Sequence, residues 1–308
     1  MVQEGKYVYC VVETEQARNF GPIGVGARGD EVLTVGYDDL SMVVSNHPMA
    51  GCAANRENLI AHQRVIERMM QEFDSVLPVR FGTIACGAGE VRNLLDRRRR
   101  EFKDRLTHMD HKVELGVKGF WRDMGVVYDE LLRENPALKR RKETLANRGG
   151  KDARGKIELG RLVKEALDAK KQVQAESVID RLRGSSYDYR LNPAIGDEMF
   201  INAAFLVGRG REKEFDNVMD DLGEAYGQAV RFLYSGPLPV FNFVNIVIHP
   251  EEWEKRPWRR RSRKESTFTA SSGRRNPGPL ALWASAAGAT RCTPSSWTIS
   301  PPSSATLR

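Results

Sequence analysis

Cysteine is scarce in this sequence, and long apolar runs are absent. Its 308 residues include four cysteines, with no CxxC spacing among them. The N-terminus lacks the basic flank, the apolar stretch and the small-residue cleavage site of a secretion signal. No apolar run approaches the roughly 20 residues that a transmembrane helix needs. We therefore expect a protein of the reducing cytosol that is soluble or is held to a surface by partners.

Catalytic motifs are missing as well. There is no GxSxG element, no cysteine near a histidine in a known catalytic spacing, and no P-loop. His108 and His111 stand one helical turn apart, but no cysteine or further histidine lies close enough to complete a metal shell, so a solvated helix face is favoured. His62 follows Leu59 on the apolar face of a predicted helix, where a hydrogen-bonded, half-buried histidine is favoured over a base. We expect no enzyme, no cofactor and no metal.

The excess of positive charge is confined to the end of the chain. The net charge is +7 and the pI is about 9.3, values that suggest a nucleic-acid or anionic partner. Residues 249–308 hold 11 Lys and Arg against 4 Asp and Glu, which leaves residues 1–248 neutral overall. This basic segment is rich in Pro, Ser and Thr without a period, and we expect it to be disordered. Its Trp253 and Trp258 are candidates for stacking on RNA bases.

The remaining composition is that of a globular protein, 41% hydrophobic and 8% aromatic. Residue patterns predict strands over residues 5–12, 30–37 and 40–46 and a helix over residues 55–73 that Asn55 caps. A strand over 75–85 and a helix over 87–110 follow. This β-β-β-α-β-α series approaches the ferredoxin-like pattern, with a Gly-rich loop in place of the first helix.

The second half predicts the whole ferredoxin-like series β-α-β-β-α-β. A strand over 112–121 precedes a long helical region over 122–183, which Asn135-Pro136 and the turn at residues 148–150 divide. Strands over 185–192 and 199–207, a helix over 211–227 and a strand over 228–236 complete it. The expected fold is α+β, with two tandem units at residues 1–110 and 111–248, a long helical insertion in the second, and a disordered tail at 249–308.

Two further motifs are open to both a structural and a functional interpretation. GVGARG fits the GxGxxG pattern of dinucleotide sites, but a strand follows it instead of a helix, so we favour a flexible connector. DRRRRE, at residues 96–101, resembles a nucleic-acid patch. Four consecutive helical residues point around a full turn, however, so a solvated helix face is favoured.

Asn202, inside an apolar strand, must be hydrogen-bonded or face outwards.

A charged residue interrupts the apolar segment SVLPVRFGTIA, at residues 75–85. Strand alternation puts Arg80 and Gly82 on one face, where the glycine leaves room for a neighbour and the guanidinium offers five donors. Because the chain holds no nucleophile, metal cluster or phosphate loop, we expect Arg80 to order the local structure. Its candidate partners are backbone carbonyls and the carboxylates of Glu57, Glu67 and Asp74.

Several segments together resemble the gas vesicle protein F/L family. They are YVYCVV, NRENLIAHQRVIERMMQEFDSVLPVRFGTIA, VKGFW, DEMFINAAFLV and GPLPVFNFVNI, and they span the predicted folded part of the chain. The helix followed by the LPVRFG strand is the most specific combination. The family-motif positions are Asn58, Leu59, His62, Leu77, Pro78, Arg80, Phe81, Gly82, Trp121, Asn202 and Phe205.

This resemblance implies a non-enzymatic accessory protein of gas vesicles, the hollow protein shells that give cells buoyancy. It implies two α/β domains, the first ferredoxin-like, and a minor structural or chaperone-like role in assembly. The implied partners are the main shell protein and, as further candidates, other accessory proteins, with no specific nucleic acid and no membrane. The implied location is the gas vesicle, within the cytoplasm. The alternative hypothesis is a ligand- or nucleic-acid-binding protein built from ferredoxin-like modules.

Overall fold

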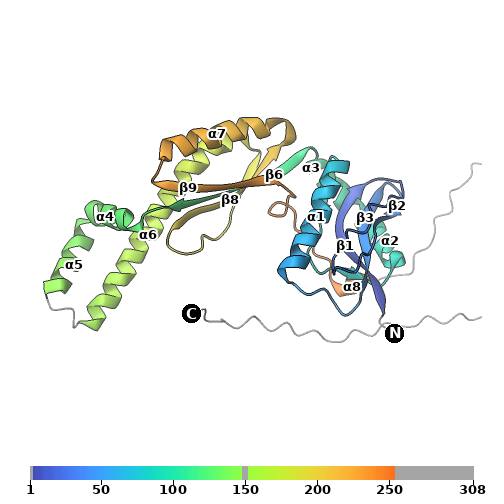
Figure 1. Ribbon diagram of the computed structural model, residues 1–308, viewed down its shortest axis with the longest axis horizontal. Coiled ribbons are helices and arrows are strands. Elements are labelled where there is room, and N and C mark those ends of the chain that lie inside the picture. Colours follow the sequence, from blue (N-terminus) through green and yellow to red (C-terminus); the bar gives the residue numbers. More distant parts are fainter. Residues whose placement is uncertain (1–2, 148–151, 254–308) are drawn as a thin grey trace, which may run out of the picture. The chain divides into compact units, whose positions relative to one another are not determined.

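Two antiparallel sheets with their helices make up the α+β fold of the chain (Figure 1). The computed structural model describes residues 3–147 and 152–253. The expected disordered tail, beyond its first few residues, lies outside this part. Within the described part, no helix combines the length and the apolar character needed to cross a membrane.

The first sheet is built around one central strand that is buried on both faces. The strands are β1 (Glu4–Glu13), β2 (Val32–Tyr37), β3 (Leu40–Pro48), β4 (Val76–Pro78) and β5 (Ile84–Ala85), in the order β2-β3-β1-β4 with β5 also on β1. One face packs against α1 (Arg56–Glu72) and the other against α2 (Ala88–Arg97) and α3 (Arg99–His108). Residues 7–12 are therefore fully buried without alternation.

Two predicted elements of the first unit are each divided in the structure, so their predicted continuity is wrong. The strand expected over 75–85 is β4 and β5, because residues 79–83 leave the sheet and Gly82 takes a φ of +83°. The helix expected over 87–110 is α2 and α3, with a break at Arg98, where φ is −100° and ψ is 15°. The Asn55 cap is confirmed, since its side chain accepts the Asn58 N–H.

The second sheet has the predicted ferredoxin-like order of elements. Its strands are β6 (Lys112–Trp121), β7 (Asp188–Leu191), β8 (Met199–Gly208) and β9 (Val230–Leu238), in the order β7-β8-β6-β9. The helical insertion between β6 and β7 comprises α4 (Met124–Glu134), α5 (Pro136–Asn147) and α6 (Ala153–Leu182), and α7 (Glu212–Tyr226) joins β8 to β9. Pro136 begins α5 where a break was predicted. In both sheets the first and third strands are central, and the first sheet lacks the first helix.

The segment that follows β9, residues 239–253, packs into the core of the first sheet; it is the last segment that the structure describes, and we call it the last segment. It ends in the short helix α8 (Pro250–Trp253). Its buried members in that core are Val240, Val244, Ile246, Ile248 and Trp253.

Two contacts of this last segment bear on the fold and on the sequence prediction. Glu114 of β6 is buried and accepts both the backbone N–H and the side-chain N–H of Asn242, at 2.8 and 2.6 Å. Burial raises the pKa of this carboxyl above its usual range. Trp253 is buried, so the prediction that it stacks on RNA bases is wrong.

Candidate functional site

Residues 79–83 form a loop that bulges from the edge of the first sheet. The loop begins where the Val79 N–H donates to the Tyr9 carbonyl and ends where the Val8 N–H donates to the Thr83 carbonyl, both at 2.9 Å. The Thr83 hydroxyl closes it by donating to the Arg80 carbonyl at 2.7 Å. Gly82 supplies the left-handed backbone that the turn requires. Arg80 and Phe81 are thereby presented outside the sheet.

The segment that follows β9, residues 239–253, lies beside this loop. Val79 and Ile246 form a parallel bridge, and the Arg80 N–H donates to the Ile246 carbonyl at 3.4 Å. Val244 and Ile246 point into the core and are buried, whereas Phe241 is 41% exposed. Two stretches that are distant in sequence therefore form adjacent walls.

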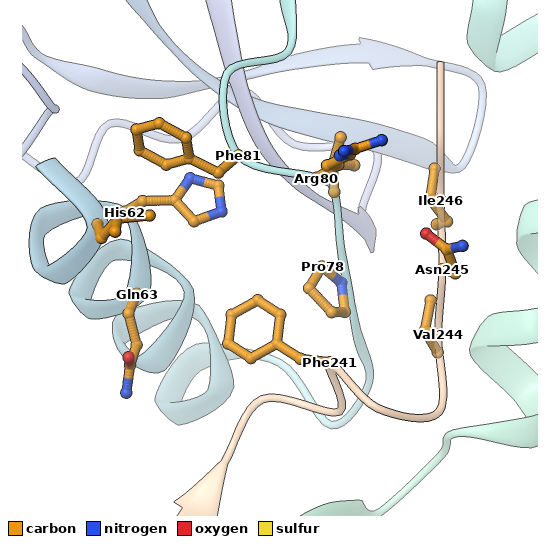
Figure 2. Close-up of a pocket in the computed structure, with 11 residues that line it drawn as sticks. His62, Gln63, Pro78, Arg80, Phe81, Phe241, Val244, Asn245 and Ile246 are labelled. Atoms are coloured by element: carbon orange, nitrogen blue, oxygen red, sulfur yellow. The ribbon is translucent and has the colours of Figure 1, made fainter. Parts of the chain in front are cut away.

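A pocket of about 390 Å³ opens between α1, the loop and the last segment (Figure 2). Helix α1 contributes Leu59, His62 and Gln63. Residues 78–81 line the pocket from β4 and the loop, and Phe241 with residues 244–246 lines it from the adjacent segment after β9. Most of these side chains are apolar, and Arg80 is the one formally charged residue among them.

His62 is the buried polar residue of the pocket. The residue is 4% exposed, and its ring lies among aromatic rings, stacked on Tyr9 at 5.6 Å and edge-on to Phe81 at 5.5 Å between centroids. Nδ1 is 3.0 Å from the Tyr7 hydroxyl. Burial lowers the pKa of His62 to about 4, and the Val79 carbonyl opposes this shift only in part. The ring is therefore neutral at pH 7.

The second polar group of interest, Arg80, does not make the pairing predicted for it. Its side chain is exposed and has no hydrogen-bond or ion-pair partner within residues 3–147 and 152–253. Among the expected partners, Glu67 instead accepts from Gln63, and Asp74 lies 3.6 Å from His111. The reason is the loop, which turns Arg80 away from the face of the sheet that alternation assigned to it. Its backbone, through Ile246 and Thr83, does order the loop.

Five of the family-motif residues line the pocket, namely Leu59, His62, Pro78, Arg80 and Phe81. Three more support it from outside. The Asn58 side chain accepts the Gly26 N–H at 3.2 Å and donates to the Ala53 carbonyl at 2.9 Å. Leu77 is fully buried in the core of the first sheet. The Gly82 N–H donates to the Tyr7 hydroxyl.

The other three lie in the second sheet and do not line the pocket. Trp121 packs against Phe200 at 5.3 Å between ring centroids, and Phe205 is fully buried against Phe215 at 5.2 Å. The Asn202 side chain donates to the Pro193 carbonyl at 3.1 Å.

Sequence reasoning missed six lining residues. They are Gln63, Val79, Phe241, Val244, Asn245 and Ile246. A signal existed for all six, because Gln63 and Val79 lie in the segment at residues 55–85 and the other four lie in GPLPVFNFVNI, and both segments carry the family resemblance. Nothing in GPLPVFNFVNI, however, indicates that this segment packs beside α1 and the loop.

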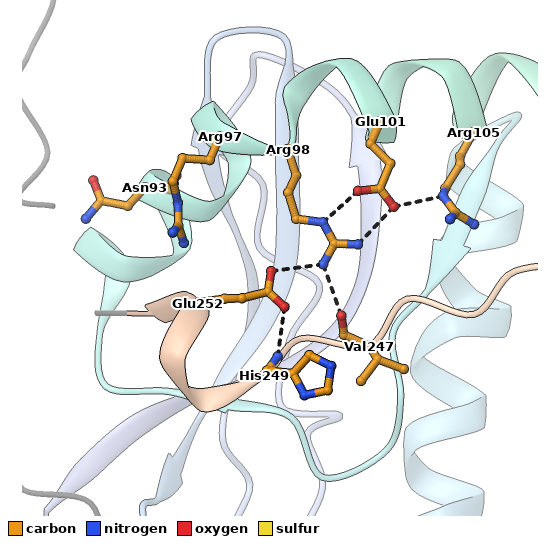
Figure 3. A network of polar contacts seen from close by, with 8 residues as sticks. All are labelled: Asn93, Arg97, Arg98, Glu101, Arg105, Val247, His249 and Glu252. Carbon is orange, nitrogen blue, oxygen red and sulfur yellow. Dashed lines mark hydrogen bonds and ion pairs between the residues drawn. The ribbon is translucent and has the colours of Figure 1, made fainter. Parts of the chain in front are cut away.

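The arginine run is only partly the solvated helix face that was expected (Figure 3). Arg98 forms a two-pronged ion pair with Glu101 at 2.8 and 2.9 Å and donates to the Val247 carbonyl at 3.0 Å. Arg99 pairs with the carboxylate of Asp39 at 2.8 Å. The prediction is wrong for Arg98, whose side chain is 18% exposed, whereas Arg99 stays 40% exposed beside its partner and Arg100 is solvated.

The remaining motifs supply no second site among the described residues. The strand β2 follows the GVGARG loop, as expected, and the loop is anchored by the Val25 N–H to the Tyr9 hydroxyl at 2.9 Å. Within the described part of the chain, no three His, Cys, Asp or Glu side chains cluster in a way that could hold a metal ion.

The pocket is chemically suited to binding. Its lining holds no hydroxyl, thiol or carboxylate side chain that His62 could activate. What it offers is apolar surface, one buried imidazole and one exposed guanidinium. These are the features of a site that recognises an apolar group and fixes its orientation through a few polar contacts.

Comparison with known proteins gives consistent matches. Residues 5–245 match a family described as "Gas vesicle synthesis protein GvpL/GvpF". Gas vesicle protein F of Streptomyces sp. (strain CB03234) is 31% identical over 241 residues, which cover 77% of this chain and 98% of the relative. Gas vesicle protein F1 of Halobacterium salinarum is 27% identical over 251 residues, covering 81% and 97%. The crystal structure of the gas vesicle protein GvpF from Anabaena sp. PCC7120 has the same fold, with a TM-score of 0.68 at 22% identity over 80% of this chain and 100% of that chain.

Proposed function

Because the chain belongs to the gas vesicle synthesis protein GvpL/GvpF family, we propose that it acts in gas vesicle assembly by binding the main shell protein. The role is that of a non-enzymatic accessory component, either a minor structural part or a chaperone-like factor. It acts at the gas vesicle within the cytoplasm, with other accessory proteins as further partners.

The observation that carries this proposal is the open apolar pocket. Leu59 is 45% and Phe241 is 41% exposed at the pocket, so two large apolar side chains face solvent beside a cavity. Exposed apolar surface around a concavity is typical of a protein-binding site. A partner that inserts an apolar side chain removes both residues from water.

The proposal is tested by co-expression with the main shell protein of the same source, followed by capture of the chain. Leu59→Ser removes an apolar wall of the pocket and is expected to weaken capture roughly tenfold. Ile60→Ser is the matched control, because Ile60 is 37% exposed on the same helix but does not line the pocket. Absence of capture by the wild-type chain, or equal loss in the two variants, contradicts the proposal.

The nucleic-acid alternative has less support in the described residues. It relied on the Gly-rich loop, the arginine run and the basic tail. The loop leads into a strand, Arg98 and Arg99 are paired with acidic side chains, and Trp253 is buried. The rest of the basic cluster falls on residues that lie outside the described part.

A further inference from the structure

His62 carries a donor that no group in the described part of the chain satisfies. The Tyr7 hydroxyl accepts the Gly82 N–H at 3.1 Å and lies 3.0 Å from Nδ1 of His62. We assign the hydroxyl hydrogen to Nδ1, because Nδ1 is the one hydrogen-bond acceptor that the described residues offer it. With Nδ1 accepting, the ring hydrogen lies on Nε2. Nε2 is buried and makes no hydrogen bond of normal distance and angle within residues 3–147 and 152–253, although the Val79 carbonyl lies near enough to oppose part of the fall in the pKa of the ring. A buried donor without an acceptor is costly, and a ligand oxygen in the pocket removes that cost.

Arg80 presents an unpaired positive charge at the same pocket. It is exposed, and no acidic side chain lines the pocket with it. The electrostatic potential at the mouth of the pocket therefore favours an anion. Most charged arginines elsewhere in the first unit, such as Arg98 and Arg99, already have carboxylate partners.

We propose that the pocket binds a bulky apolar residue of a partner polypeptide, with its backbone carbonyl accepting from Nε2 of His62 and an adjacent acidic side chain pairing with Arg80. This inference rests on the proposed function and specifies the chemistry of the partner's docking segment. A volume of about 390 Å³ is at the small end of ligand pockets, which suits one large side chain and its backbone. A polypeptide is the occupant that also covers the exposed Leu59 and Phe241.

The test uses the full-length chain with a parent peptide and two analogues of it, each of which carries one substitution. The probes are acetyl-Gly-Leu-Glu-Gly-amide, its Gln analogue, which lacks the charge, and its Ala analogue, which lacks the bulky side chain. Binding is followed by the shifts of backbone amide signals in NMR spectra. We expect the Leu-Glu peptide to bind with a Kd of about 1 mM. The Gln analogue should bind about threefold more weakly and the Ala analogue about tenfold more weakly.

Variants of Arg80 separate the charge contribution from the apolar one. Arg80→Gln is expected to abolish the difference between the Glu and Gln peptides and to keep the preference for Leu over Ala. Arg64→Gln is the matched control, because Arg64 is an exposed arginine of α1 that does not line the pocket. An equal effect of the two substitutions overturns the role of Arg80, since it leaves only a general charge effect.

Variants of His62 test the donor. In His62→Asn the amide replaces Nδ1 as the partner of Tyr7 and the Nε2 donor is lost, whereas in His62→Gln a donor is kept near Nε2. We expect His62→Asn to weaken the Leu-Glu peptide about fivefold and His62→Gln to weaken it less. Where either variant fails to fold, the Arg80 comparison decides.

Three outcomes overturn the inference. They are the absence of binding up to about 10 mM peptide, equal affinity for the Glu and Gln peptides, and shifts that map outside the pocket. Self-association of the chain that the peptide competes away assigns the pocket to a second copy instead. If shell-protein capture still depends on Leu59 in these cases, only the chemistry of the docking segment is wrong and the proposed function stands.

Discussion

His62 is held neutral by the aromatic rings that surround it. Its helix position relative to Leu59 predicted a half-buried, hydrogen-bonded histidine on an apolar face, whereas the structure buries it almost completely and identifies Tyr7 as the hydrogen-bond partner. That bond could not be read from the sequence, because it depends on the register of β1 beneath α1. The same burial that presents Nε2 to the pocket also lowers the pKa of the ring.

This pKa gives the chain a defined response to acid. The folded-state pKa is about 4 and the ordinary value is 6.5, so the folded state resists protonation. The contribution of the neutral His62 ring to the free energy of unfolding is complete above pH 6.5. It is lost as pH falls towards 4, and the total loss is about 3 kcal/mol. We expect His62→Asn to flatten this fall in urea denaturation between pH 7.5 and 4.5.

Two comparisons isolate this effect. The pKa of Glu114 is raised in the folded state, so its contribution to the free energy of unfolding falls as pH rises, which is the opposite direction. This contribution is the same in the wild type and in His62→Asn, so it cancels when the two are compared. His111→Asn, which removes an exposed imidazole, is the control for loss of a histidine elsewhere. If His62→Asn and His111→Asn give the same dependence of stability on pH, the low pKa of His62 is wrong.

At the scale of elements, the break between α2 and α3 places Arg98 where it binds the segment that follows β9, residues 239–253 (Figure 3). Arg98 binds the Val247 carbonyl and reaches Glu252 at 3.4 Å, while Glu252 accepts the His249 N–H at 3.0 Å. The apolar pattern of residues 87–110 runs through the break. The sequence therefore predicted the two helices as one and assigned no task to Arg98.

Removal of this guanidinium should loosen the last segment. The Arg98 side chain is 18% exposed, and its hydrogen bonds are charge-assisted. We expect Arg98→Ala to lower the free energy of unfolding by about 2 kcal/mol in urea denaturation and to speed amide exchange of the segment around Val247. Arg100→Ala is the control, since its side chain is 96% exposed and should change stability by less than about 0.5 kcal/mol. Equal effects of the two changes would show that the network does not stabilise the segment.

Strand and helix positions were otherwise predictable because they depend on local patterns. The span of β6 was predicted to the residue, and β8 to within one. The loop at residues 79–83 was not, because its apolar residues read as a continuing strand and only Gly82 hinted at a turn. This one error explains why the partners expected for Arg80 were wrong.

At the scale of the whole molecule, the pocket depends on a contact between distant parts of the chain. Two of its walls, α1 and the loop, are close in sequence, and Leu59, His62 and Arg80 were named together because the family resemblance rests on that helix and the strand after it. The third wall follows the second sheet and returns to the first core through Val244 and Ile246. Its local pattern is apolar but carries no information about which surface covers it.

The last prediction concerns that returning segment. A chain that ends after Leu238 loses the five buried apolar residues that the segment adds to the first core, as well as the donors of Asn242 to Glu114. Their burial contributes on the order of 10 kcal/mol, which is comparable with the whole stability of a domain. We expect this chain to lose cooperative unfolding of the first sheet in thermal denaturation. A chain that ends after Arg260 keeps all five residues and should unfold within a few degrees of the full-length protein. Cooperative unfolding of the first sheet without the segment would mean that it folds alone and that the pocket's third wall is an addition to a complete core.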